Sequence, residues 1–461
     1  MEIVGKAYCL PIRACQSLAG SFNEKAMKVI TERNTTVRTE ILAGFTTFAA
    51  MAYILAVNPD ILSATGMPKG ALITATALLV IGGSLLMALL THFPFTIGPS
   101  IGTATYFAYF LCGKLGFAWQ EALSVVFWTG VIFFILIVSG IKKKIVDNIS
   151  DSLKIGIQCG IGFFIAFVGL KSTGVIVANS NTLVGEGDIL SPTVLLVLGS
   201  ILLMGALTIR RFPGGILLAV VFSTVAGFWI HGLDGQPITH MPTAFVSIPH
   251  SVAPLFCQLD WFFPFRHFDK AFAPILSLLL LQMFDVLGAL VALTRQAGFV
   301  HHGKIMHFSK ALSVSALSTM LAGCLGTSTA TNFMEASAGV ESGGRTGWTA
   351  VTVAVLFTIA LFFTPLIAII PNEATAPVLI LIGLFLLQGL RFLKFDDFSE
   401  AAPALFTMVM IPLTFSIAKG FSLGFLFYVG LKLLSGKRKQ LTPITLILGA
   451  LFIFYFILEA A

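Results

Sequence analysis

GTSTATNFMEASAGVESGGRTG, residues 326–347, separates two long apolar stretches of the chain. It consists largely of Gly, Thr, Ser and Asn, and it carries a carboxylate at Glu335. Membrane interiors admit such a segment only where it lines a cavity or is buried within protein. The stretch therefore predicts a broken helix at the centre of a transport protein.

The composition of the chain is that of a membrane protein. Of its 461 residues, 57% are hydrophobic and 11% are charged, and the mean hydropathy is +0.95. Soluble domains carry about 25% charged residues, and a helix that crosses a bilayer needs roughly 20 mostly apolar residues. Many stretches reach that length, so the chain is predicted to be an all-α polytopic membrane protein whose surroundings are the lipid bilayer.

The apolar stretches predict about fourteen transmembrane segments, in two sets of seven on either side of a wetter stretch at 232–271. A last apolar run, at 442–457, makes the number of spans ambiguous. Either this run is an extra crossing, or 401–435 forms a bent unit that does not cross the membrane twice. The fourteen candidate spans lie at about 41–57, 71–91, 93–112, 120–140, 152–171, 191–209, 214–231, 272–294, 307–324, 326–342, 348–370, 375–392, 401–416 and 421–435.

The basic residues predict how the spans are oriented. Most of the 28 Lys and Arg residues fall on one side if the spans alternate from a cytoplasmic N-terminus, and cytoplasmic loops are enriched in these residues. We expect a multi-pass protein of the cell membrane, with residues 1–38 in the cytoplasm and an interfacial helix near 20–32. Because each set holds an odd number of spans, the second is inverted relative to the first, as in many secondary transporters.

Several functional classes find no support in the sequence. The net charge of +7 is explained by short loops beside apolar spans, so we expect no nucleic-acid partner. The six cysteines lack metal-ligand spacing, and no P-loop, Rossmann, zincin or nucleophile-elbow motif is present. We therefore expect no metal and no cofactor, and we expect that the chain is not an enzyme.

Two segments in corresponding positions of the two halves resemble each other. The third span contains GPSIGTATYFAY (98–109), and the third span of the second half contains GTSTATNF (326–333). Paired interruptions of this kind point to a binding site near the middle of the membrane. The alternative is that small residues let two intact helices pack closely. Pro99 and the density of β-branched Thr favour unwound or strand-like segments.

Asp285 lies near the middle of an apolar helix, in LLLLQMFDVLGALVALT (278–294). A charged side chain there costs about 3 kcal/mol, and such residues usually face the protein interior and have a function. Gln282, Gly288 and Ala289 are expected to share its helical face. The alternative is a structural Asp that caps a neighbouring backbone segment.

Glu335 follows Asn332 by three residues. If a half-helix begins near Thr331 or Asn332, Glu335 lies in its first turn, where free N–H groups and the positive helix end suit a polar ligand. The alternative is that Glu335 only caps the helix. In the first span, Asn58 and Pro59 are expected to end the helix, with a structural role for Asn58.

Four segments together resemble the AzgA-like purine permeases of the nucleobase/ascorbate transporter family. They are TTFAAMAYILAVNPDIL (46–62), FDVLG (284–288), GTSTATNFMEASAGVESGGRTG (326–347) and IPNEATAPVLILIG (370–383). The resemblance implies fourteen spans in two inverted seven-span repeats, with short strands in the broken spans 3 and 10. It also implies a core domain that rocks against a gate domain, with a possible homodimer through the gate domain.

The resemblance also implies domain boundaries. The cytoplasmic segment would be 1–38 and the extracytoplasmic loop 232–271. The core domain would be 39–140 (spans 1–4) and 272–370 (spans 8–11), and the gate domain would be 141–231 (spans 5–7) and 371–461 (spans 12–14).

Site residues follow from the same resemblance. Asp285 and Glu335 would hold a purine base and couple its movement to a proton. The other residues implied to contact the base are Phe284, Phe333, Met334, Asn332, Thr103 and Ala104.

The chain departs from the family pattern near these residues. The usual APGMGLNAFFAY reads GPSIGTATYFAY, so that an Asn position is Ala104. The usual FDTxGT reads FDVLGA, so that two hydroxyl positions are Val286 and Ala289. Losing polar groups alters which ligands a pocket rejects.

Three functions remain open on the sequence alone. The first is proton-coupled uptake of adenine, guanine or hypoxanthine by alternating access. The second is transport of another small polar solute or an anion on the same fold, although two acidic side chains would repel an anion. The third is an intramembrane enzyme or receptor, for which no nucleophile or metal set is evident.

Overall fold

The structure of the protein is a computed structural model. It describes residues 33, 35–139, 150–179, 182–210, 212, 214–232, 235–242, 244–301, 304–393, 395–414 and 417–460. The predicted interfacial helix at 20–32, and nearly all of the predicted cytoplasmic segment 1–38, lie outside these residues.

The first half of the chain is helical apart from three short strands. Its elements are α2 (Val37–Met51), α3 (Ile54–Ser63), α4 (Lys69–Thr91), β1 (Ile97–Pro99), α5 (Ile101–Thr105), the π-helix η1 (Tyr106–Lys114), α6 (Trp119–Val138), α8 (Asp151–Ser172), β2 (Ile176–Asn179), β3 (Leu183–Glu186), α9 (Pro192–Ile209) and α10 (Gly215–Ala226).

The second half begins after a long connection and again contains three short strands. Its elements are α11 (Phe263–Arg266), α12 (Phe268–Gln296), β4 (Val300–His301), β5 (Lys304–Ile305), α13 (Phe308–Leu325), β6 (Ala330–Asn332), α14 (Ala336–Glu341), α15 (Gly347–Ala360), η2 (Leu361–Phe363), α16 (Thr364–Ala368), α17 (Asn372–Leu387), η3 (Gln388–Phe392), α18 (Phe398–Thr414), α19 (Ile417–Leu434), η4 (Arg438–Gln440) and α20 (Pro443–Ala460).

Within the described ranges, nine helices are long and apolar enough to cross a membrane. Two shorter apolar helices, α10 and α18, accompany them. The predicted third and tenth spans are absent from this group because each is divided between a strand and short helices. The prediction of a polytopic helical protein with strands in these two spans is confirmed.

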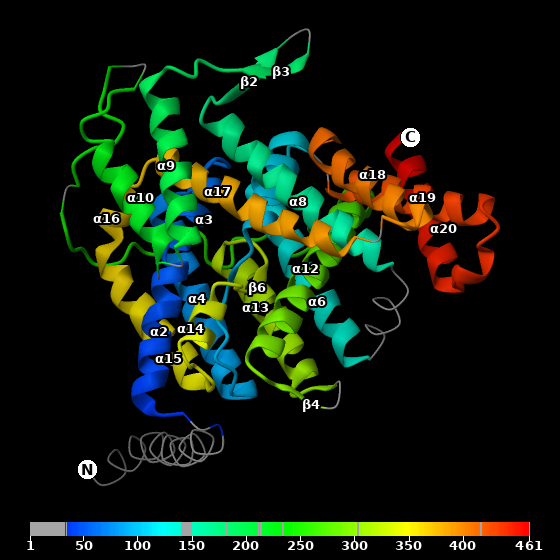
Figure 1. Ribbon diagram of the computed structural model, residues 1–461, viewed down its shortest axis with the longest axis horizontal. Helices are drawn as coiled ribbons and strands as arrows, with labels where there is room; N and C mark the ends of the chain where they lie inside the picture. Colours follow the sequence, from blue (N-terminus) through cyan, green and yellow to red (C-terminus); the bar gives the residue numbers. More distant parts are fainter. Residues whose placement is uncertain are drawn as a thin grey trace.

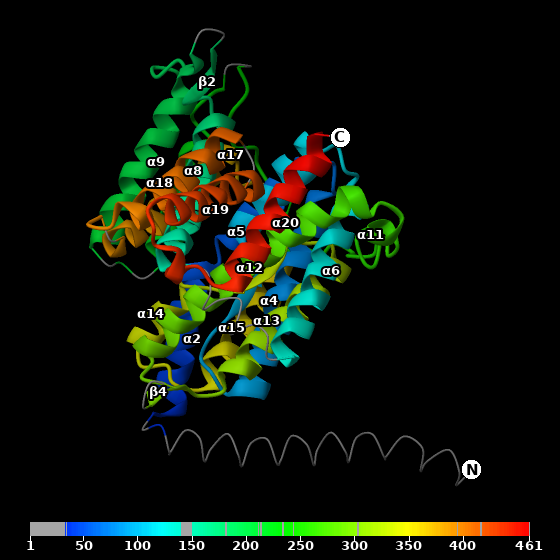
Figure 2. The ribbon, with the colours of Figure 1, turned by 90° about the vertical axis from the view of Figure 1, so that its right-hand side faces the viewer.

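The helices pack in two sets (Figures 1 and 2). The first set comprises α2, α3, α4, α6, α12, α13, α14 and α15, which pack mainly on one another. The second set comprises α8, α9, α10, α17, α18 and α19. Figure 2 shows the second set at the upper left and most of the first set below it and to its right. Fewer elements join the sets, among them α3 with α17 and α12 with α19.

The two broken spans cross inside the first set. Strands β1 and β6 pair antiparallel, with Ile97 opposite Asn332 and Pro99 opposite Ala330. The pairing continues at both ends, where Ser100 N donates to Thr329 O at 2.8 Å and Phe333 N donates to Thr96 O at 3.0 Å. Backbone groups that leave a helix inside a membrane protein must find partners within the protein. Each broken span supplies the hydrogen bonds that the other lacks.

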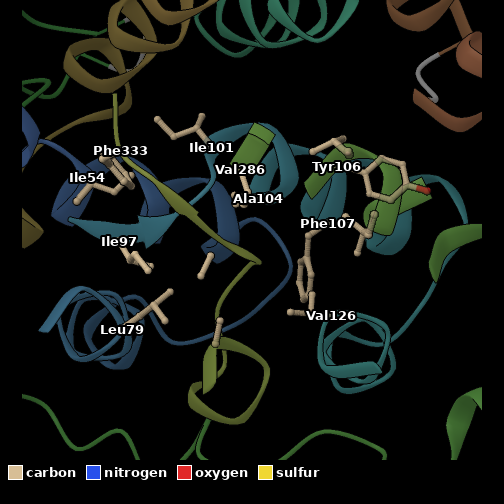
Figure 3. Close-up of a cluster of buried hydrophobic side chains, with 14 of the residues drawn as sticks. Ile54, Leu79, Ile97, Ile101, Ala104, Tyr106, Phe107, Val126, Val286 and Phe333 are labelled. Atoms are coloured by element: carbon tan, nitrogen blue, oxygen red, sulfur yellow. The ribbon is translucent and has the colours of Figure 1, made fainter. Parts of the chain in front are cut away.

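Apolar side chains surround this crossing (Figure 3). Ile97 lies above Leu79 of α4, and Phe333 lies beside Ile54 of α3. All four side chains are buried. The crossing is therefore fixed by packing on both sides as well as by the backbone.

The first span differs from its prediction. Its helix breaks at Ala52 and Tyr53, where α2 gives way to α3, and α3 continues through Pro59 to Ser63. The expectation that Asn58 and Pro59 end the helix is wrong. The break lies upstream, and Pro59 is accommodated within the second helical piece, as happens in membrane helices whose neighbours satisfy the freed groups.

The expected structural role of Asn58 is confirmed. Its side-chain amide donates to Thr76 Oγ1 at 2.8 Å and to Thr327 Oγ1 at 3.0 Å. Asn58 thereby ties α3 to α4 and to the start of the second broken span.

The half-helix of the tenth span begins later than predicted. Strand β6 runs to Asn332, and α14 starts only at Ala336, so Glu335 precedes the first helical residue. The N–H groups of Ala336 and Ser337 donate to the carbonyls of Phe333 and Met334 in a tight turn, at 3.1 and 2.9 Å. These groups are therefore not available to a ligand, contrary to the expectation for a free helix end.

Candidate functional site

Asp285 projects from α12 toward the strand crossing. The Ser100 hydroxyl, directly after β1, donates to Asp285 Oδ2 at 2.8 Å. Asp285 is partly exposed although it lies in the middle of an apolar helix. Its carboxyl group therefore joins α12 to the first broken span.

Glu335 lies in the turn between β6 and α14. It makes no capping bond to the helix that follows, so the capping interpretation is wrong. Instead, the Tyr53 hydroxyl donates to Glu335 Oε1. Tyr53 is buried at the break between α2 and α3, which lets its ring leave the helical path. The break in the first span thus positions a hydrogen-bond donor for Glu335.

The two acidic side chains belong to neighbouring elements. Helix α12 packs against β6 and α14, and Asp285 and Glu335 are close enough for their charges to interact. Each accepts a hydrogen bond from a hydroxyl group that comes from a different broken or bent span. The arrangement is a pair of carboxyl groups oriented by hydroxyl donors, with further acceptor positions on their oxygens.

A buried polar scaffold holds the strands from behind. The Gln282 amide donates to Thr319 Oγ1, and Ala330 N of β6 donates to the same hydroxyl at 3.0 Å. The Asn332 amide donates to Ser315 Oγ at 3.2 Å. The Thr329 hydroxyl donates to Thr103 Oγ1 at 2.8 Å. These bonds tie β6 to α13, the residue before β6 to α5, and α13 to α12.

The predicted site residues therefore divide into two groups. Asn332 and Thr103 are buried in the scaffold, and Phe333 is buried against Gly98 of β1. Met334 is 50% exposed, and Phe284 is partly buried beside Asp285. Asp285, Glu335, Phe284 and Met334 are the members that have exposed surface near the crossing.

The residues predicted to share the helical face of Asp285 on α12 also differ in exposure. Gln282 is buried and used by the scaffold, whereas Gly288 is exposed, with open space where a side chain would begin. Ala289 is buried. The open part of this face therefore runs from Asp285 to Gly288.

Two of the departures from the family pattern lie together. Figure 3 shows Ala104 of α5 beside Val286 of α12, and both side chains are fully buried. Both positions, where the family pattern has an amide and a hydroxyl, are therefore occupied by buried apolar side chains that need no hydrogen-bond partner.

Sequence reasoning did not identify Tyr53 or Ser100 as site residues. Tyr53 lies within 46–62, which carried the family resemblance, and Ser100 lies within 98–109, which departs from the family pattern. The available signal was a phenol in an otherwise apolar helix and a Ser beside Pro99. Neither indicates a carboxylate partner, because that contact depends on how the spans cross.

Comparison with known proteins places this arrangement in a family. The profile of the Permease family matches residues 38–423. The chain is similar to the guanine/hypoxanthine permease PbuG of Bacillus subtilis, at 38% identity over 92% of this chain and 98% of that protein. It is similar to the adenine permease AdeQ of Escherichia coli, at 37% identity over 91% of this chain and 93% of that protein.

Among solved structures, the fold is similar to the transmembrane domain of a cyanobacterial bicarbonate transporter, BicA. The TM-score is 0.62 at 17% identity, and the match covers 83% of this chain and 96% of that domain. The two share the inverted-repeat membrane fold, which confirms the predicted fold class.

Proposed function

Since this chain belongs to the Permease family, we propose that it is a secondary active transporter that takes up purine nucleobases together with protons. Two relatives that match along nearly their whole length are named as an adenine permease and a guanine/hypoxanthine permease. Adenine, guanine and hypoxanthine are therefore the proposed substrates. A permease of this family is a multi-pass membrane protein, and for this one we propose the cell membrane and a cytoplasmic N-terminus.

The observation that supports the proposal best is the pair of hydroxyl-bonded carboxyl groups at the strand crossing. Asp285 and Glu335 are partly exposed there and retain oxygen atoms that can accept hydrogen bonds. A purine base presents several N–H donors in one plane. Two carboxyl groups from neighbouring elements can accept such donors together, and either can carry a proton.

We assign the other predicted residues according to their surroundings. Phe284 and Met334, which have exposed surface, would contact the flat faces of the base. Asn332, Thr103, Phe333 and Ala104, which are buried, would fix the backbone against which the base lies.

Transport would proceed by alternating access. The first set of helices would act as the core domain, which carries the base, and the second set as the gate domain. One proton that moves inward gains about 2.3 kcal/mol per 100 mV, which is enough to concentrate a neutral base severalfold or more.

Uptake of radiolabelled bases tests this proposal. Cells that lack their own purine uptake and express the protein should accumulate at least one of adenine, guanine and hypoxanthine. A protonophore and the Asp285→Asn variant should each abolish accumulation. The control variant is Glu186→Gln, which changes an exposed carboxylate on β3. Accumulation that resists both treatments would rule out proton coupling through Asp285, and absence of uptake for all three bases would rule out the substrate class.

An anion carrier is the competing function on the same fold. The paired acidic side chains argue against it, because like charges repel at short range. Sulfate or bicarbonate in excess should therefore leave uptake of the labelled base unchanged. Inhibition by either anion would favour the competing function.

A further inference from the structure

A cavity lies at one end of the first set of helices, away from the strand crossing. Its volume is about 480 Å³, and η1, the start of α6, α11 and the start of α12 form its walls. Cavities of roughly 300–1,000 Å³ are the size that small ligands occupy. We call it the α11 pocket. Its lining combines aromatic rings, among them Tyr106, Phe110 and Phe272, with the charged side chains of Glu121, Asp269 and Lys270.

The α11 pocket is distinct from the central site but shares two elements with it. On α12, the lining residue Ser277 precedes Asp285 by eight residues, which is about 12 Å along the helix axis. On the third span, Tyr106, the first residue of η1, follows Ser100 by six residues. One wall of the pocket therefore continues along α12 to Asp285, and another continues along the third span to Ser100, which donates a hydrogen bond to Asp285.

The π-helix η1 accounts for the aromatic wall. Tyr106 and Phe110 stack with their ring centres 4.8 Å apart and their planes 21° apart. Figure 3 shows the Tyr106 hydroxyl pointing away from Ala104 and the strand crossing, whereas Phe107 turns toward Val126 of α6. A π-helical turn changes the direction of side chains relative to an α-helix, and it is common at functional sites. Here it places two stacked rings in the lining of the pocket.

The charged residues give the pocket both kinds of hydrogen-bonding partner. Glu121 Oε2 accepts from Ala118 N at 2.9 Å, so its other carboxylate oxygen and Asp269 supply acceptors, and Lys270 supplies donors. Asp269 and Lys270 are exposed, and Glu121 is partly exposed, whereas Phe110 and Tyr106 are buried. The pocket therefore has an apolar aromatic interior and a charged rim. That pattern suits a flat, neutral, polar heterocycle better than it suits an ion or a lipid chain.

We propose that the α11 pocket is a second binding site for the purine base, which it holds before the base reaches the central site. This inference rests on the proposed function and on the proposed orientation, which puts α11 on the extracytoplasmic side. The rings stack on the base, and Glu121, Asp269 and Lys270 pair with its N–H groups and ring acceptors. Occupancy raises the concentration of base at the start of the path along η1 and α12.

The number of bound bases per chain tests the inference. Equilibrium binding to the purified full-length protein should use whichever of adenine, guanine and hypoxanthine the wild-type protein takes up fastest. We expect two bases per chain for the wild type and one for the combined Glu121→Gln, Phe272→Ala variant. We also expect one for Asp285→Asn combined with Glu335→Gln, because the α11 pocket remains.

Uptake provides the second measurement. In Phe272→Ala, which removes a ring that would stack on the base, the base concentration for half-maximal uptake should rise by about tenfold. The maximal rate should be unchanged. The matched control is Phe265→Ala, which removes an exposed ring of α11 that packs on Trp128 outside the lining. Wild-type protein that takes up base but binds one per chain, with uptake unchanged in Phe272→Ala, would overturn this inference alone. Wild-type protein that neither takes up nor binds any of the three bases would overturn the proposed function as well.

Discussion

Tyr53 donates a hydrogen bond that orients the carboxyl group of Glu335. It lies at the bend between α2 and α3, two otherwise ordinary apolar helices of the first span. A hydrogen bond to a charged group contributes about 1.5–3 kcal/mol. Removing the hydroxyl while keeping the ring should therefore impair the site without leaving a cavity.

We predict that Tyr53→Phe lowers the rate of base uptake by about tenfold or more. Because the hydroxyl acts through Glu335, Tyr53→Phe combined with Glu335→Gln should be no worse than Glu335→Gln alone. Initial uptake rates of the wild type, the two single variants and the double variant form the required cycle. Thermal stability of the purified proteins is the control for folding. Additive losses would show that Tyr53 contributes independently of Glu335.

At the residue scale, the sequence draws attention to the charged residues near the strand crossing and not to the hydroxyl groups that bond them. Asp285 and Glu335 stand out because placing a carboxylate in an apolar span costs free energy, so that such residues usually have a function. The same logic does not separate Tyr53 or Ser100 from many other hydroxyl-bearing residues. The family resemblance also implied that Asn332 and Thr103 contact the ligand, whereas the structure buries both in the scaffold behind the strands.

At the scale of elements, the crossing of β1 and β6 depends on a close approach at Gly98. A Cβ atom at this position would lie 2.6 Å from Phe333 Cε2 and 3.2 Å from Val80 Cγ2. Phe333 is held in place because its N–H bonds Thr96 O at 3.0 Å. A side chain at Gly98 therefore separates the strands or displaces the residues just before Glu335.

We predict that Gly98→Val destabilises the protein by about 1–3 kcal/mol, as overpacking of a core does, and abolishes uptake. Gly98→Ala should show a weaker form of both effects. The matched control is Gly199→Ala on α9, where a Cβ atom meets nothing within 4 Å. The measurements are thermal unfolding in detergent and initial uptake. Full activity in Gly98→Val would mean that the close approach of the strands is not needed for transport.

The existence of these elements was more predictable than their ends. Pro99 and the Thr-rich runs indicated that spans 3 and 10 are interrupted, and both interruptions are strands. The start of α14 was placed too early because β6 uses Thr331 and Asn332 in the ladder. Pro59 suggested a helix end, but the bend lies at Ala52 and Tyr53, where no Pro or Gly marks it. These boundaries depend on partners far apart in the sequence.

At the scale of the whole molecule, two contacts join the two sets of helices on the side of the α11 pocket. The Thr375 hydroxyl of α17 donates to Asp60 Oδ2 at 2.8 Å, and Lys114 Nζ donates to Thr414 O at 2.6 Å. Asp60 is itself paired with Lys69 at 2.9 Å within the first set. Under the proposed orientation, these contacts close the extracytoplasmic side. Under the proposed alternating access, movement of one set against the other would break them.

We predict that linking Asp60 to Thr375 stops transport. In a background without the six native cysteines, Asp60→Cys with Thr375→Cys should form a disulfide on oxidation, and uptake should fall to the level of untransfected cells. Reduction should restore it. The expected loss follows because the bond holds the two sets in the arrangement seen here, and a carrier that alternates between two states needs both.

The matched control joins two residues of the second set. Asn372 Nδ2 donates to Ser172 O at 3.1 Å, so Asn372→Cys with Ser172→Cys places a comparable link within one rigid group of helices. Its oxidation should leave uptake unchanged, because those helices move together. Complete cross-linking of positions 60 and 375 with undiminished uptake would show that the two sets do not move apart on this side. The division of the chain into a moving core and a gate would then have to be drawn elsewhere.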